Sequence, residues 1–113
     1  MTKLQLNDKL SALYKLPKSV INVTRFTSEI IDGKQKDTYE TDYILIIDCW
    51  NVLMDLAIDN DIWVQPYNNI GFVYVHKREK LNFIDTYYKD HESPKAATRF
   101  AIAMALVKLA EDK

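Results

Sequence analysis

The apolar stretch Phe100-Ala-Ile-Ala-Met-Ala-Leu-Val107, near the C-terminal end of the sequence, decides the fold. Alanine, leucine and methionine are strong helix formers, Ser93 is a good N-cap, and Pro94 suits a first helical position. The sequence therefore predicts a helix from Pro94 to Leu109. Because no residue between 100 and 107 is polar, this helix must be covered on opposite sides. We expect a sheet on one side of it and a second helix, or a partner subunit, on the other.

The composition predicts a single globular domain over residues 1–113, with 48% hydrophobic and 27% charged residues. Two glycines are too few for a glycine-rich phosphate loop, and the lone Cys49 excludes an internal disulfide or a cysteine-based zinc site. The first residues contain no apolar signal segment, and every apolar run is shorter than the ~20 residues that span a bilayer. These features predict a small soluble protein of the reducing cytoplasm.

The first third of the chain contains helix, strand and turn signals in that order. Asn7-Asp8 can cap a helix that continues to Lys15. The β-branched stretch Ser19–Ile31 predicts a strand, although neither of its faces is cleanly apolar. Asp32-Gly33 predicts a turn, and the polar residues Lys34–Asp37 predict a loop after it.

The segment Thr41–Asp59 allows two interpretations. Tyr43–Ile47 taken alone is typical of a buried strand. Over the longer segment, however, apolar residues at positions 46, 49, 50, 53, 56 and 57 have helical spacing, and Thr41 or Asp42 can act as the cap. We predict one long helix over residues 41–59.

Three short strands follow, namely Ile62–Pro66, Ile70–His76 and Leu81–Tyr88. Asn68-Asn69 predicts a hairpin between the first two strands, and the charged residues 77–80 predict a turn before the third. The complete order α-β-α-β-β-β-α predicts an α+β fold, in which helices pack on an antiparallel sheet of about four strands.

Three pieces of the chain carry a family likeness. Leu6-Asn7 opens the first helix, Thr41-Asp42 leads into a segment with a central Cys49-Trp50, and Ser93-Pro94-Lys95-Ala96-Ala97 opens an alanine-rich closing helix. In these features the sequence resembles the phage ABA-sandwich domain family, which consists of small phage and prophage proteins of unassigned function. It departs from that pattern at Met104, where a cysteine is often seen. The resemblance implies a phage accessory gene and an α/β/α layering, and it transfers no functional residues.

Residues with catalytic or metal-binding chemistry are few. His76 and His91 are the only histidines, and their spacing is not that of a helical zinc pair. Asp59-Asn60-Asp61 begins like a calcium loop but lacks the glycine and glutamate that such a loop needs further on. Cys49 lies among acidic and apolar residues, which favours a core cysteine over a nucleophile. We therefore expect no metal, no cofactor and no enzymatic activity.

Acidic residues are concentrated in one part of the chain. Residues 37–61 contain seven Asp or Glu and no Lys or Arg, whereas residues 1–36 contain seven Lys or Arg. A negative surface of this kind can compete with nucleic acid for the basic groove of another protein, and exposed aromatic residues can anchor the contact. The predicted partner-binding residues are Asp37, Glu40, Asp42, Asp48, Asp55, Asp59, Asp61, Trp63 and Tyr67.

Together with the family resemblance, these features predict a non-enzymatic phage protein that binds and blocks a host factor in the host cytoplasm. We expect an anti-defence inhibitor of the anti-CRISPR kind, which presents an acidic surface to a host protein or protein complex. The net charge of −1 argues against direct nucleic-acid binding, and no membrane contact is expected.

Two alternative functions fit the same sequence. The first is a protein that binds or sequesters a nucleotide signal, with aromatic rings on the base and cations on the phosphates. Its predicted ligand-binding residues are Tyr74, Arg78, Tyr87, Lys95 and Arg99. The second is a homo-oligomeric structural protein, such as a homodimer, whose subunit interface is the Phe100–Val107 helix with Ile102 and Leu106 on the contacting side.

Overall fold

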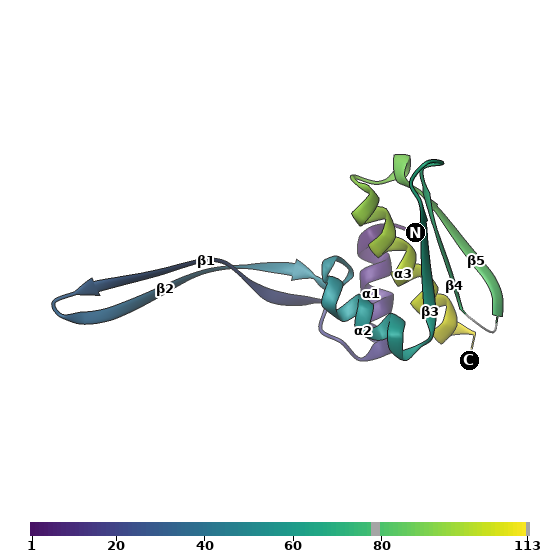
Figure 1. The fold of residues 1–113 in the computed structure, drawn as a ribbon. Coiled ribbons are helices and arrows are strands. Elements are labelled where there is room, and N and C mark those ends of the chain that lie inside the picture. The colour runs from purple at the N-terminus through teal and green to yellow at the C-terminus, as the bar shows by residue number, and fades with distance from the viewer. Residues whose placement is uncertain (78–79, 113) are drawn as a thin grey trace.

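The computed structural model describes residues 1–77 and 80–112, and for residues 80–84 it describes the backbone alone. It has the predicted α+β fold, with three α-helices and two antiparallel sheets. A compact body holds the helices and a three-stranded sheet, and a long two-stranded arm projects from it (Figure 1). The elements are α1 (Lys3–Tyr14), β1 (Ser19–Ile31), β2 (Lys34–Leu45), η1 (Ile46–Asp48), α2 (Trp50–Asp59), β3 (Ile62–Tyr67), β4 (Phe72–Lys77), β5 (Lys80–Tyr87), η2 (Tyr88–Asp90) and α3 (Pro94–Glu111).

The predicted closing helix is confirmed as α3. The Ser93 hydroxyl accepts a hydrogen bond from the Ala96 backbone N–H at 3.1 Å, and Pro94 occupies the first turn. The sheet β3-β4-β5 packs on one side of α3 and α1 on the other (Figure 1), so the apolar helix is covered within one chain. The prediction of a subunit interface on this helix is therefore wrong, because Ile102 and Leu106 are completely buried inside the body.

The first helix starts earlier than predicted. Thr2, not Asn7-Asp8, is its N-cap: the Thr2 hydroxyl accepts from the Gln5 N–H, and the Gln5 side chain accepts from the Thr2 N–H in return. The helix ends at Tyr14, and Lys15 closes it in the left-handed conformation.

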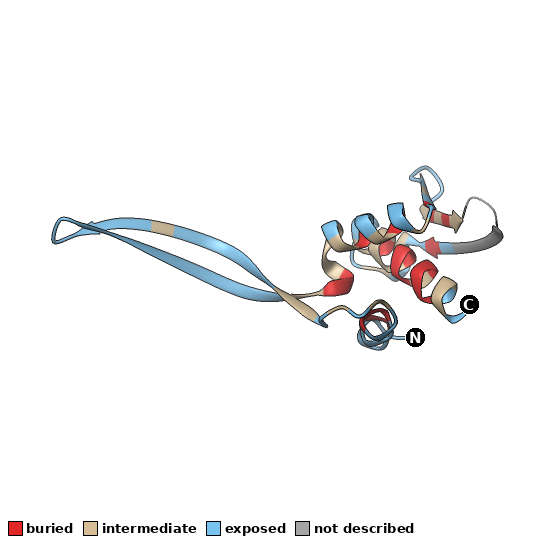
Figure 2. Cartoon of the chain, turned by 90° about the horizontal axis from the view of Figure 1, so that it is seen from below, coloured by how far each residue is buried: buried red, intermediate tan, exposed pale blue. Residues whose placement is uncertain are grey.

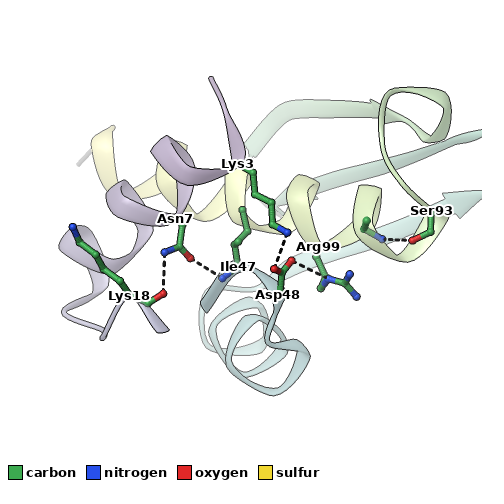
Figure 3. A network of polar contacts seen from close by, with 8 residues as sticks. Lys3, Asn7, Lys18, Ile47, Asp48, Ser93 and Arg99 are labelled. Carbon is green, nitrogen blue, oxygen red and sulfur yellow. Dashed lines mark hydrogen bonds and ion pairs between the residues drawn. The ribbon is translucent and has the colours of Figure 1, made fainter. Parts of the chain in front are cut away.

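Asn7 lies inside α1 and is buried, although sequence reasoning placed it at the helix start. Its side-chain amide donates to the Lys18 carbonyl at 2.9 Å, and its carbonyl accepts from the Ile47 N–H at 3.0 Å (Figure 3). Lys18 lies directly before β1, and Ile47 is the second residue after β2, in η1. One amide therefore joins α1 to both ends of the arm.

Residues 19–45 form the arm, an antiparallel ribbon that extends the molecule to 64 Å along its longest axis. The strand Ser19–Ile31 and the turn Asp32-Gly33 are confirmed, both turn residues having positive φ as a tight hairpin requires. The predicted loop Lys34–Asp37 is wrong, because these residues begin β2 and pair with residues 28–31. These residues are polar because the ribbon lies in solvent (Figure 2). A strand without a buried face lacks the alternation of apolar and polar residues by which a strand is predicted.

The predicted long helix Thr41–Asp59 is also wrong in its first half. Tyr43 and Ile44 pair with Ile21 and Val20 as the end of β2, and only Trp50–Asp59 are α-helical. Residues 43–45 satisfy their backbone groups across the ribbon by pairing with residues 19–21, which outweighs the helical spacing further along the chain. The alternative, a buried strand over Tyr43–Ile47, is correct in its strand conformation for residues 43–45 alone, because Tyr43 is exposed and Ile46 and Ile47 belong to the 3₁₀ helix η1.

The five described strands form two sheets, β1-β2 and β3-β4-β5, instead of one sheet of about four strands. In the three-stranded sheet the residues Ile62, Val73 and Val75 are buried toward the helices. All three helices lie on this side of the sheet (Figure 1). The layers therefore run helix, helix, sheet, which differs from the α/β/α order that the family resemblance implies.

Tyr14 provides a test of the packing between α1 and α3. Its hydroxyl donates to the Leu106 carbonyl at 2.6 Å, and burial raises the pKa of this hydroxyl above its ordinary value near 10. A raised pKa means that Tyr14 contributes full stability below pH ~10 and loses it as the pH rises through the higher folded value. We expect the free energy of unfolding to fall above pH 10, and to fall less steeply in Tyr14→Phe.

Urea titrations at several pH values measure this effect, with Tyr87→Phe on the exposed face of the three-stranded sheet as the control. An equally steep loss in Tyr14→Phe and in the control would contradict the assignment to Tyr14.

Candidate functional site

The face of β3-β4-β5 that points away from the helices is covered with rings. Trp63, Tyr67 and Tyr87 are 45%, 42% and 49% exposed. They share this side with partly exposed neighbours on β4, because alternate residues of a strand point to the same face and the strands are paired in register. We call this surface the aromatic sheet face, and it consists of Trp63, Tyr67, Phe72, Tyr74, His76 and Tyr87.

The rings of the aromatic sheet face contact one another in two groups. Toward one end of the strands, Phe72 stacks on Tyr67 with centroids 5.0 Å apart and meets Tyr87 at 5.9 Å. Toward the other end, His76 lies 5.0 Å from Tyr74 and 6.0 Å from Trp63. Ring packing of this kind restricts the side chains before any partner arrives, so less conformational entropy is lost on binding.

Two charged groups modify the aromatic sheet face. Asp85 on β5 pairs with Tyr74 across the sheet. Burial among its neighbours raises the pKa of the Tyr74 hydroxyl, and the charges of Asp85 and Tyr67 raise it further. At one end of the face the Lys89 ammonium lies 5.8 Å from the Tyr87 ring centroid, which is a cation–π distance. The face thus combines π surfaces with a carboxylate and already contacts one cation.

The predicted acidic partner-binding residues do not form one surface. Three of them lie on β2 of the arm, two on α2 and one in the turn before β3, and these are Asp37, Glu40, Asp42, Asp55, Asp59 and Asp61. Since the acidic block spans an arm strand and a separate helix, its charges face in several directions. Trp63 and Tyr67, from the same prediction, lie together on the aromatic sheet face.

Asp48, another predicted partner-binding residue, has a structural environment. Its carboxylate lies 2.7 Å from the Lys3 ammonium and 3.9 Å from Nε of Arg99 (Figure 3). The Arg99 guanidinium in turn lies 5.2 Å from the Trp50 ring centroid. Asp48 therefore connects η1 to α1 and α3, and its charge is largely satisfied within the chain.

The predicted ligand-binding residues are separated by the sheet. Tyr74 and Tyr87 lie on the aromatic sheet face, whereas Lys95 and Arg99 lie on α3, on the other side. Arg78 lies outside the described residues. The described members of this set therefore do not form a single site.

A hollow of about 680 Å³ lies at the start of α3, between the N-terminal residues and η2. Its charged lining is balanced, with three basic and three acidic side chains: Lys3, Lys89, Arg99, Asp48, Asp90 and Glu92. This balance gives a phosphate group no net attraction, although a helix N-terminus is close by. Within the described residues there is no cluster of three or more His, Cys, Asp or Glu side chains that could hold a metal ion.

Sequence reasoning found four members of the aromatic sheet face but divided them between two different sites. It missed Phe72 and His76, for which the only available signal was the alternation of rings with valines along residues 72–76.

No helix in the described part of the chain has the length and apolar character needed to span a bilayer. No known protein family, curated protein or solved structure matches this chain.

Proposed function

We propose that this chain is a non-enzymatic phage accessory protein that binds a host protein through the aromatic sheet face. The observation that carries the proposal is that the helices cover one side of the three-stranded sheet, while the other side presents a cluster of exposed rings. Tryptophan and tyrosine contribute much of the energy of protein interfaces, because each buries a large apolar area and retains a polar group. The phage origin of the chain rests on the family resemblance.

The chemistry of the aromatic sheet face favours a partner that supplies cationic side chains. Ring faces attract arginine and lysine, as Lys89 and Tyr87 illustrate within the chain, and the Asp85 carboxylate offers an ion pair beside the rings. The same carboxylate repels the phosphates of a nucleic acid. A basic protein surface, such as the groove of a nucleic-acid-binding defence complex, is therefore the partner class that we propose. Blocking that groove would inhibit the complex without any chemical step.

The proposal predicts that Trp63→Ala weakens partner binding about 30-fold, the size expected for truncating an aromatic anchor at an interface centre. Ile58→Ala, at an exposed position on α2, is the matched control and should leave binding unchanged. The measurement starts with affinity capture from a bacterial host lysate, comparing the two variants with the unmodified chain. The captured protein is then purified and its affinity for each variant is determined by calorimetry.

Equal affinity of the partner for Trp63→Ala and Ile58→Ala would contradict the proposal. Capture that disappears after nuclease treatment, together with direct binding of an oligonucleotide to the purified chain, would instead identify a nucleic-acid-binding face.

A further inference from the structure

The arm is exposed to solvent along almost its whole length. From Ile21 to Tyr43 every residue except Thr27 is exposed, and the two strands pack on each other as they project from the body (Figures 1 and 2). An isolated two-stranded ribbon is at best marginally stable in water and gains stability when one of its faces is covered. A partner that covers one face of the arm would therefore stabilise it.

A bulge at residue 24 gives the arm one apolar face. The pairing shifts by one residue between Val23 and Arg25, so apolar residues at odd positions before the bulge and at even positions after it lie on the same side. The Phe26 and Tyr39 rings lie together near the middle of this side, with centroids 5.1 Å apart. We call it the apolar arm face, and it contains Ile21, Val23, Phe26, Ile30, Tyr39 and Tyr43, each of them more than half exposed.

The charged residues of the arm are mostly on the opposite face. Arg25 pairs there with Glu40, with 3.9 Å between Nη1 and Oε1, and Glu29 lies across from Lys36. Among the described residues, the apolar arm face carries one charged side chain, Asp37. Its carboxylate accepts hydrogen bonds from the Ser28 hydroxyl at 2.8 Å and from the Gln35 amide at 3.2 Å. These two hydrogen bonds offset part of the cost of covering this carboxylate, which is the one charge on the apolar arm face among the described residues.

We infer that the apolar arm face binds the same face of a second copy of this chain, forming a two-fold symmetric dimer. Six large side chains would be covered on each copy, which amounts to about 800 Å² per partner and matches a stable protein interface. The apolar residues flank the central Phe26–Tyr39 pair on both sides. A two-fold axis at this pair places Ile30 of one arm against Ile21 of the other, and keeps the two bodies at opposite ends.

The charge of the arm favours this occupant over nucleic acid. Residues 19–45 contain three Lys or Arg and five Asp or Glu, a difference of −2, so the ribbon is repelled by phosphates. In the dimer the charged faces of both arms remain in solvent, because they point away from the contact. The inference does not depend on the proposed function, which uses a different sheet.

Two adjacent isoleucines provide a matched test. Ile30 lies on the apolar arm face and is 80% exposed, whereas Ile31 lies on the opposite face and is 46% exposed. We expect the unmodified chain and Ile31→Asp to be dimers in light scattering after size exclusion. Ile30→Asp should raise the dimer dissociation constant about 100-fold, because each dimer would bury two carboxylates in an apolar contact. Both changes lie far from the core, and circular dichroism verifies that each variant is folded.

A chain that remains monomeric over a wide concentration range would overturn the inference, as would a dimer that both variants leave intact or both dissociate. Phe26→Asp, at the proposed axis, gives a second measurement and should dissociate the dimer as Ile30→Asp does. A dimer that dissociates on Trp63→Ala but persists in Ile30→Asp would assign the contact to the aromatic sheet face. Loss of host-protein binding in Trp63→Ala with an intact dimer concerns the proposed function alone.

Discussion

Replacing Leu106 by alanine is expected to lower the free energy of unfolding by about 3 kcal/mol. Leu106 is completely buried at the centre of α3, in the layer between α1 and the three-stranded sheet. Truncating its side chain removes packing contacts within the hydrophobic core and leaves a cavity that the surrounding elements close only in part. Because the body is small, this loss is a large part of its total stability.

Urea denaturation monitored by circular dichroism measures the change. Leu4→Ala is the matched control, since Leu4 also lies on a helix but is 63% exposed, and it should cost less than about 0.5 kcal/mol. A cost at Leu106 no larger than that at Leu4 would show that α3 is not the centre of the core.

The second large effect is expected at Asn7, although it is a polar residue in a helix. Asn7→Ala removes two hydrogen bonds and leaves the Ile47 N–H without its partner in the interior. The cost of that unsatisfied group exceeds the gain in helix propensity, so we expect a net loss of about 2–3 kcal/mol. Losing the hydrogen bond from Asn7 costs less at the Lys18 carbonyl, because this carbonyl also accepts from the Ile46 N–H at 3.1 Å.

Asn51→Ala on the exposed surface of α2 is the control and should change the stability little. Thermal unfolding compares the two variants directly. If Asn7→Ala melts at or above the temperature of the unmodified chain, the amide does not act as the buried link between α1 and the arm.

Local signals explain why α3 and β1 could be predicted from the sequence. The cap at Ser93, the proline at the first turn and the run of helix formers all act within α3, and the Asp32-Gly33 turn acts within four residues. The segment around Tyr43–Leu45 could not be predicted in this way. Two local patterns compete there, a run typical of a strand and a helical spacing, and the pairing with residues 19–21 decides between them.

The apolar arm face could not be predicted from the sequence either. Strict alternation places Ile21 and Val23 on one side and Phe26 and Ile30 on the other, so the strand looks mixed. The bulge at residue 24 brings these residues to one side, but a bulge in a solvent-exposed ribbon has no clear sequence signature.

For the candidate site, the individual rings were visible in the sequence and their grouping was not. Trp63, Tyr67, Tyr74 and Tyr87 are typical interface residues by type alone. Their assembly on one face depends on the antiparallel register of three strands, and their exposure depends on which side of the sheet the helices occupy. Only tertiary packing decides the second point.

The closed base of the arm favours an order of folding in which the arm forms before the body. The Ile46 N–H donates to the Lys18 carbonyl, so the chain leaves the body and returns to it at almost the same place. A hairpin closes from its turn outward through contacts between near neighbours, on a microsecond timescale. Zipping from Asp32-Gly33 therefore brings α1 close to α2 early, and the body avoids the entropy cost of closing a long open loop.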